Sequence, residues 1–156
     1  MELRAEESLD TYGIYSSMTR GVSMWPLFKT HRDRVYIVKP EGDLAAYDVA
    51  LYPDGYGNYI MHRVVRVCER EYLIRGDNTF RLEHVPKQRV IGVLSEFDRK
   101  GTHLTVSHPL YRLYSRVWTW IYPIRSVVHA LVYLVRGGGR RVLRLLKKRS
   151  GKKNEE

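Results

Sequence analysis

Ser23 and His62 are the side chains of this sequence whose types best suit acyl transfer. Ser23 lies in the sequence Gly-Val-Ser-Met-Trp-Pro at residues 21–26. Gly21 permits backbone angles that are closed to other residues, and Pro26 fixes φ and removes a donor. Such constraints can lift a hydroxyl out of a packed surface. Ordinary turns also gather Gly, Ser and Pro, so this stretch alone does not distinguish a nucleophile from a simple turn.

His62 lies inside a predicted strand at residues 59–67, on the same face as Ile60 and Val64. A serine hydroxyl is a poor nucleophile until a base takes its proton, and histidine, with an ordinary pKa of about 6.5, suits that task near neutral pH. A single histidine in a strand is more often structural. The residues alone therefore leave both roles open.

The elements that would position these residues are short strands. Residues 53–58 are rich in Pro, Gly, Asp and Asn and predict a hairpin. Residues 1–13 predict a short acidic helix, or a loop, that ends near Gly13. A run of strands without long helices between them favours a mainly β, antiparallel domain over residues 14–108. The predicted strands cover residues 14–18, 34–39, 48–52, 59–67, 71–75, 90–94 and 103–107.

Several motifs occur in an order that resembles a known family. They are Gly-Val-Ser-Met-Trp-Pro at 21–26, Asp-Val-Ala-Leu-Tyr at 48–52, His-Arg-Val-Val at 62–65, Arg-Gly-Asp-Asn at 75–78 and Ile-Gly-Val at 91–93. Over residues 15–108 the chain resembles the S24/S26 serine peptidases, which include type I signal peptidases and self-cleaving LexA-like repressors. The histidine in an His-Arg-Val context is similar to the endoplasmic-reticulum and SipW-like branch. Small bacterial members also share the run Pro-Leu-Tyr-Arg-Leu-Tyr-Ser-Arg at 109–116.

The resemblance implies a signal peptidase/LexA-like antiparallel β-ribbon fold and a peptidase without a cofactor or metal. Ser23 would be the nucleophile and His62 the general base, with the oxyanion bound by the Ser23 amide and the turn at Gly21. Either of two acids would orient His62. We prefer Asp77, which matches the family's Gly-Asp-Asn motif, and keep Glu83, where endoplasmic-reticulum-type members carry a second acid.

Two turns depart from the family pattern. Arg32-Asp33 and Tyr47-Asp48 stand where the family has Gly-Asp. Both turns are therefore expected to need another backbone geometry.

The excess positive charge lies in the last third of the chain. Residues 1–108 carry 15 Lys/Arg and 15 Asp/Glu, whereas residues 109–156 carry 12 Lys/Arg and 2 Asp/Glu, so that the second segment accounts for the net charge of +10. This distribution favours a tail that meets an anionic membrane surface, and we expect no nucleic-acid partner. The single Cys68 argues against a disulfide framework or a zinc site.

We expect residues 109–156 to form an aromatic and basic helical tail that associates peripherally with a membrane. Residues 117–135 are nearly long enough to span a bilayer, but Pro123, Arg125 and His129 interrupt them and disfavour spanning. Residues 140–149 have the pattern of a basic helix on anionic lipid, or of a solvated helix packed on the domain. The N-terminal residues have no signal-peptide pattern. We expect the protein to associate with the cytoplasmic face of the membrane.

The leading hypothesis is a serine endopeptidase of the signal-peptidase type that cleaves a leader or signal-like peptide near a membrane. One alternative is a catalytically inactive peptide-binding or scaffold module of the same fold at the membrane surface. Another is a LexA-like self-cleaving regulator. That reading is disfavoured because residues 1–20 leave no room for a DNA-binding domain and because such regulators normally use lysine as the base.

Overall fold

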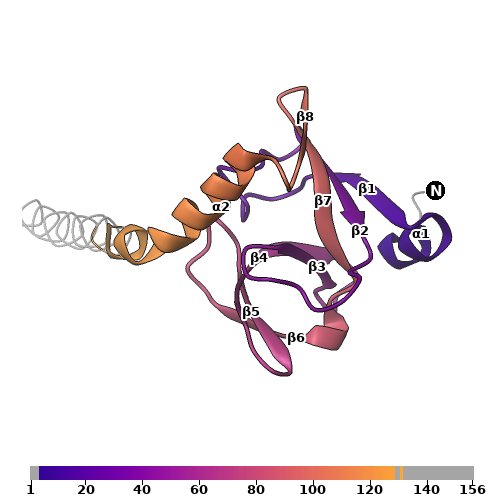
Figure 1. Ribbon diagram of the computed structural model, residues 1–156, viewed down its shortest axis with the longest axis horizontal. Helices are drawn as coiled ribbons and strands as arrows, with labels where there is room; N and C mark the ends of the chain where they lie inside the picture. Colours follow the sequence, from indigo (N-terminus) through magenta and orange to yellow (C-terminus); the bar gives the residue numbers. More distant parts are fainter. Residues whose placement is uncertain (1–3, 129–130, 132–156) are drawn as a thin grey trace, which may run out of the picture. The chain divides into compact units, whose positions relative to one another are not determined.

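A computed structural model describes residues 4–128 and 131, and this part of the chain is mainly β (Figure 1). Its strands pair in antiparallel fashion in one curled sheet with the order β1-β2-β7-β3-β4-β5-β6, and β8 pairs with β7. The predicted mainly β, antiparallel class is confirmed. The strands are β1 (Ile14–Met18), β2 (Arg34–Val38), β3 (Val49–Pro53), β4 (Tyr59–Val67), β5 (Glu71–Arg75), β6 (Glu83–Pro86), β7 (Gly92–Arg99) and β8 (Thr102–Thr105).

Short helices accompany the sheet. The α-helix α1 (Ala5–Tyr12) ends at Gly13, which takes a left-handed φ of 73° as its C-cap, so the predicted acidic helix is confirmed. The 3-10 helix η1 (Lys87–Arg89) links β6 to β7, and α2 (Pro109–Trp120) follows β8. Within the described residues, no helix is both long enough and apolar enough to cross a membrane.

Most strand predictions are close to the structure. β1, β4 and β5 have the predicted bounds, and β3 and β4 form the predicted hairpin with Ala50 opposite His62. β7 is longer than the predicted 90–94. β6 was not predicted, and it places Glu83 opposite Ile74 of β5.

Both faces of the sheet are buried at β3, which lies between β7 and β4. Val49 and Leu51 belong to one core cluster with Ile37 and Phe97, while Ala50 belongs to the other with Val64 and Ile74. Because successive side chains of a strand point to opposite faces, both faces of β3 must be apolar. This explains why residues 49–52 read as a continuous apolar run.

The first eleven residues of α2 belong to the compact unit that contains the sheet. That unit ends at Thr119, whereas the sequence predicted a boundary after residue 108. Tyr111 is buried in the core cluster, and its ring lies 5.3 Å from that of Phe97. Helix α2 thus supplies part of the core, and the predicted domain limits stay a prediction. The predicted basic helix at 140–149 and the glycines at 137–139 lie outside the described residues.

Candidate active site

Ser23 lies in a turn that leaves the end of β1. Gly21 has a φ of 78°, a left-handed conformation that glycine adopts without strain, and the Trp25-Pro26 peptide bond is cis. The carbonyl of Ser23 accepts a hydrogen bond from the Asn78 amide at 2.7 Å. The Asn78 side chain also donates to the carbonyl of Val22 at 3.2 Å. Asn78 of the Gly-Asp-Asn loop therefore holds the serine turn by hydrogen bonds to two main-chain carbonyls of that turn.

His62 contacts an acid on β6. Its Nδ1 lies 2.9 Å from Oε1 of Glu83, and the histidine is buried while the glutamate is about one-quarter exposed. The two side chains come from strands β4 and β6, which both flank β5. When Nδ1 of neutral His62 carries the proton, it donates a hydrogen bond to Glu83. The other ring nitrogen, Nε2, is then a hydrogen-bond acceptor.

Tyr52 is a further member of this cluster. Its position on β3, opposite Ile60, places it on the same face as His62. Its hydroxyl donates to Oε2 of Glu83 at 2.9 Å and lies 3.3 Å from Nδ1 of His62. Burial and the adjacent Glu83 carboxylate both raise the pKa of Tyr52, so the hydroxyl stays protonated and acts as a donor. Glu83 is thus held at both carboxylate oxygens.

The environment keeps His62 neutral at pH 7. Burial lowers the pKa of His62, and the Glu83 carboxylate opposes this shift without cancelling it, so the pKa lies below its ordinary 6.5. A neutral imidazole can accept a proton, which is the state that a general base needs.

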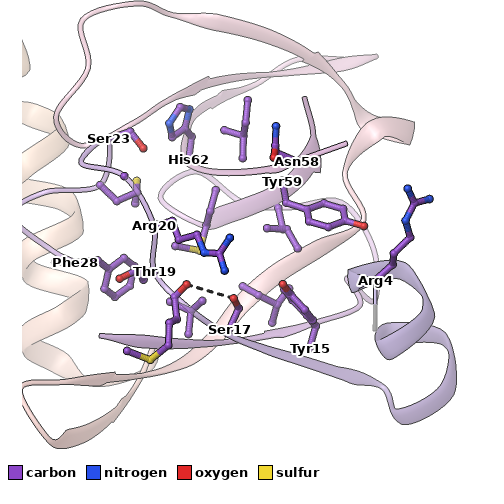
Figure 2. Close-up of a pocket in the computed structure, with 18 of the residues that line it drawn as sticks. Arg4, Tyr15, Ser17, Thr19, Arg20, Ser23, Phe28, Asn58, Tyr59 and His62 are labelled. Atoms are coloured by element: carbon purple, nitrogen blue, oxygen red, sulfur yellow. Dashed lines mark hydrogen bonds between the residues drawn. The ribbon is translucent and has the colours of Figure 1, made fainter. Parts of the chain in front are cut away.

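Nε2 of His62 faces the serine turn across Gly76. A β-carbon at position 76 would lie 2.9 Å from His62 Nε2 and 2.7 Å from the Ser23 carbonyl oxygen. Figure 2 shows the Ser23 hydroxyl and the His62 ring side by side at one end of a pocket. Over the part of the chain that the structure describes, no hydrogen bond joins Ser23 Oγ to His62. Such bonds are often longer in a protein without substrate than in the substrate complex.

Asp77 forms an ion pair with the buried Arg63. Its two oxygens accept from Nε and Nη2 of Arg63, both at 2.8 Å. The acid at Nδ1 of His62 is Glu83 and not Asp77, the acid preferred from the sequence. The reason is the pairing of β5 with β6, which brings Glu83 up to β4, whereas Asp77 follows the end of β5 and meets Arg63 on the other face of β4.

Helix α2 completes the surroundings of this ion pair. Nη1 of Arg63 donates to Ser115 Oγ at 2.9 Å and to the Tyr111 hydroxyl at 3.3 Å. Tyr114 donates to Oδ2 of Asp77, and Trp118 Nε1 donates to the Asp77 carbonyl, both at 2.9 Å. Burial alone would lower the pKa of Arg63, but the ion pair with Asp77 outweighs it and raises the pKa.

A groove of about 630 Å³ leads to Ser23 and His62 (Figure 2). One wall is β1, which pairs only with β2, and the other is the first part of β4. Residues 59–62 of β4 pair with β3 on one side, while β5 pairs with β4 only from Arg63 onward. Both walls therefore present strand edges to which a peptide could add as a further strand.

The two turns that depart from the family pattern still contain left-handed residues. Tyr47 has a φ of 80° and His31 a φ of 55°. Asp33 is fully buried and accepts from the Lys29 amide at 2.7 Å and from Nε of Arg32 at 2.7 Å. Each turn therefore contains a left-handed residue that is not a glycine, at residue 47 and at residue 31.

Comparisons with protein-family models, with curated proteins and with solved structures found no match. The resemblance to S24/S26 peptidases rests on the motifs of the sequence and stays a prediction.

Proposed function

We propose that this protein is a serine endopeptidase of the signal-peptidase type, with Ser23 as nucleophile, His62 as general base and Glu83 as the acid that orients the base. The observation that carries the proposal is the arrangement of His62. The Nδ1 nitrogen of His62 is hydrogen-bonded to Glu83, and its Nε2 nitrogen faces the turn that holds Ser23. A buried histidine with one nitrogen on a carboxylate and the other near a serine suits acyl transfer.

In the proposed reaction, Ser23 Oγ attacks the carbonyl carbon of a peptide bond while its proton passes to Nε2 of His62. Glu83 stabilises the imidazolium that forms. The imidazolium then protonates the leaving amine, and an acyl-serine ester remains. Water attacks this ester with His62 again as base, which releases the acid and restores the serine.

The oxyanion of the tetrahedral intermediate requires a donor. Within residues 4–128 and 131, the Ser23 amide donates no hydrogen bond, so it is available for this role. The left-handed Gly21 shapes the turn that presents this amide. In this proposal the donor belongs to the nucleophile itself.

The substrate proposed for this site is an extended peptide. A leader or signal-like segment would add a strand at the edge of β1 or of residues 59–62. Met24, Phe28 and Leu51 line the groove and favour apolar or small side chains near the reacting bond.

The test is cleavage of leader or signal-like peptides, including those encoded near the gene, by the purified full chain. Wild-type protein should cleave at a defined bond, and Ser23→Ala and His62→Ala should each abolish cleavage. Cleavage that survives either substitution would refute the assignment. A serine-reactive phosphonate that labels Ser23 supports the proposal, whereas peptide binding with neither cleavage nor labelling would identify an inactive peptide-binding module.

We also propose that the protein associates peripherally with an anionic membrane. On α2, the buried Tyr111 and Ser115 face the domain, while Leu110, Leu113 and Val117 are 70%, 59% and 46% exposed. These three residues follow helical spacing and form an apolar outer face. An apolar helix face, continued by a basic segment, is typical of helices that lie in a membrane interface.

A further inference from the structure

Arg20 places a charge inside the groove beside the candidate nucleophile. It lies between the end of β1 and Ser23, is exposed, and lines the groove. Figure 2 shows its side chain between Ser23 and His62 on one side and Tyr15 and Ser17 on the other. Over residues 4–128 and 131, its guanidinium makes no ion pair or hydrogen bond.

Among the residues that the structure describes, none that lines the groove is an acid that could neutralise this charge. Its lining includes Arg4 and Arg20 but no aspartate or glutamate. Glu83 lies behind His62, where its oxygens are held by His62 and Tyr52. At the α1 end of the groove, the Tyr59 hydroxyl bonds to Glu6, and this pair lies close to Arg4. The positive charge of Arg20 is therefore the one without a nearby acidic partner.

We propose that Arg20 selects peptides that carry an acidic side chain close to the bond that is cleaved. This inference rests on the proposed function and adds the class of substrate. A guanidinium presents donors in a planar fork that matches a carboxylate, and such charge-assisted pairs are stronger than neutral hydrogen bonds. Met24 and Leu51 also line the groove and give it apolar walls.

The preference should depend on position. A peptide bound as a strand along β1 or β4 turns successive side chains to opposite faces. Only alternate positions can therefore face Arg20. An acidic residue at one position should strengthen binding, while the same residue one position along should not.

The test measures peptide binding rather than cleavage, because binding does not require a working nucleophile. Full-length Ser23→Ala protein is titrated with labelled, acetylated and amidated peptides of alanine, serine and valine. One position, moved along the peptide, carries Glu, Gln or Lys. At the favoured position the Glu peptide should bind about tenfold more tightly than the Gln peptide at low salt, and the difference should shrink at high salt.

Charge reversal then assigns the effect to Arg20. In the Ser23→Ala background, Arg20→Gln should remove the preference and Arg20→Glu should favour the Lys peptide. Arg66→Glu is the matched control, because Arg66 is also exposed but does not line the groove, and it should leave the Glu preference unchanged.

Equal binding of the Glu and Gln peptides at every position would overturn the inference, as would a preference that survives Arg20→Gln. Failure of the proposed function is a separate result. In that case wild-type protein cleaves none of the peptides, while the dependence of binding on Arg20 can still be present. Cleavage that requires Ser23 but ignores peptide charge would retain the function and reject the role of Arg20.

Discussion

Asp77 and Arg63 form a two-point ion pair directly behind the candidate site, with both nitrogen–oxygen distances at 2.8 Å. Each partner is adjacent in sequence to a residue of the site. Arg63 follows His62 on β4, and Asp77 lies between Gly76 and Asn78, which meets the Ser23 carbonyl. The pair therefore ties the strand that carries the base to the loop that holds the nucleophile.

Removing one member of this pair should be far more damaging than removing both. Asp77→Ala leaves the charge of Arg63 buried without its counterion and is expected to lower the free energy of unfolding by about 3–5 kcal/mol. The double variant Arg63→Met/Asp77→Leu should lose less, because no charge is left buried. Urea denaturation of the single and double variants measures the difference. An equal loss of unfolding free energy in the single and double variants would show that an unpaired buried charge is not the cause of the destabilisation.

Glu83→Gln should lower catalysis while the fold is preserved. A glutamine cannot stabilise the imidazolium and does not select the required tautomer, so kcat should fall by about a hundredfold or more. Because Glu83 raises the pKa of His62, its neutralisation should also move the acid limb of the pH–rate profile to lower pH. Asp98→Asn, a change at an exposed ion pair with His103, is the control and should leave both quantities unchanged. A shift of the acid limb to higher pH would contradict the arrangement.

Gly76→Ala tests the closeness of the serine turn to the histidine. The added β-carbon would meet the Ser23 carbonyl oxygen at 2.7 Å and His62 Nε2 at 2.9 Å, so one of them must move. A misplacement of about 1 Å in a catalytic arrangement costs about a hundredfold in rate. The matched control is Gly42→Ala, where the β-carbon would meet nothing within 4 Å. Cleavage rates and thermal unfolding of both variants give the result, and unchanged activity in Gly76→Ala would show that cleavage does not depend on the close approach of the serine turn and His62 at Gly76.

The pH dependence of wild-type protein follows from the lowered pKa of His62. Activity should rise with pH through a midpoint below the ordinary 6.5 and then reach a plateau. Stability should change in the same direction. The unfolded chain binds a proton at His62 near pH 6.5 and the folded chain only at lower pH, so the histidine contribution to folding is lost as the pH falls through this interval. Urea midpoints of wild-type and His62→Gln across this range isolate the contribution, and a parallel pH dependence would exclude it.

The apolar outer face of α2 predicts membrane binding. Leu113→Glu should weaken binding of the full chain to vesicles that contain anionic lipid, because the exposed Leu113 would otherwise enter the interface. The control is Thr102→Glu, an exposed change on β8. Sedimentation with vesicles at low and high salt measures both, and salt should weaken binding. Equal binding to neutral vesicles, or identical binding by the Leu113 variant, would contradict the proposal.

Local patterns predicted the parts of the fold that depend on local chemistry. The alternation and branched residues of β4 and β5 set their bounds, and the glycine of the serine turn has the left-handed φ that its type suggested. β6 gives no such signal, because its four residues are Glu-His-Val-Pro. The sequence thus named Glu83 as a candidate, but the strand that positions it was found only in the structure.

The choice between the two acids depends on non-local pairing. Both Asp77 and Glu83 lie near the end of β5 in sequence, and only the register of β5 with β4 and β6 decides which acid reaches His62. The His-Arg-Val motif contains Arg63, but it does not indicate that this arginine is buried and paired with Asp77. Tyr52 belongs to the motif at 48–52, but the motif does not indicate its contact with Glu83; a tyrosine at a buried strand position has a hydroxyl that requires a partner.

The dependence of the Arg63–Asp77 pair on α2 has a consequence for the order in which the protein is made. Ser23, His62 and Glu83 emerge from the ribosome well before Tyr111, Ser115 and Trp118, which complete the buried contacts of Arg63 and Asp77. A nascent chain that ends before α2 contains every candidate catalytic residue but not the contacts that fix the loop beside Ser23. The surroundings of the site are therefore complete only after residues 111–118 have been made.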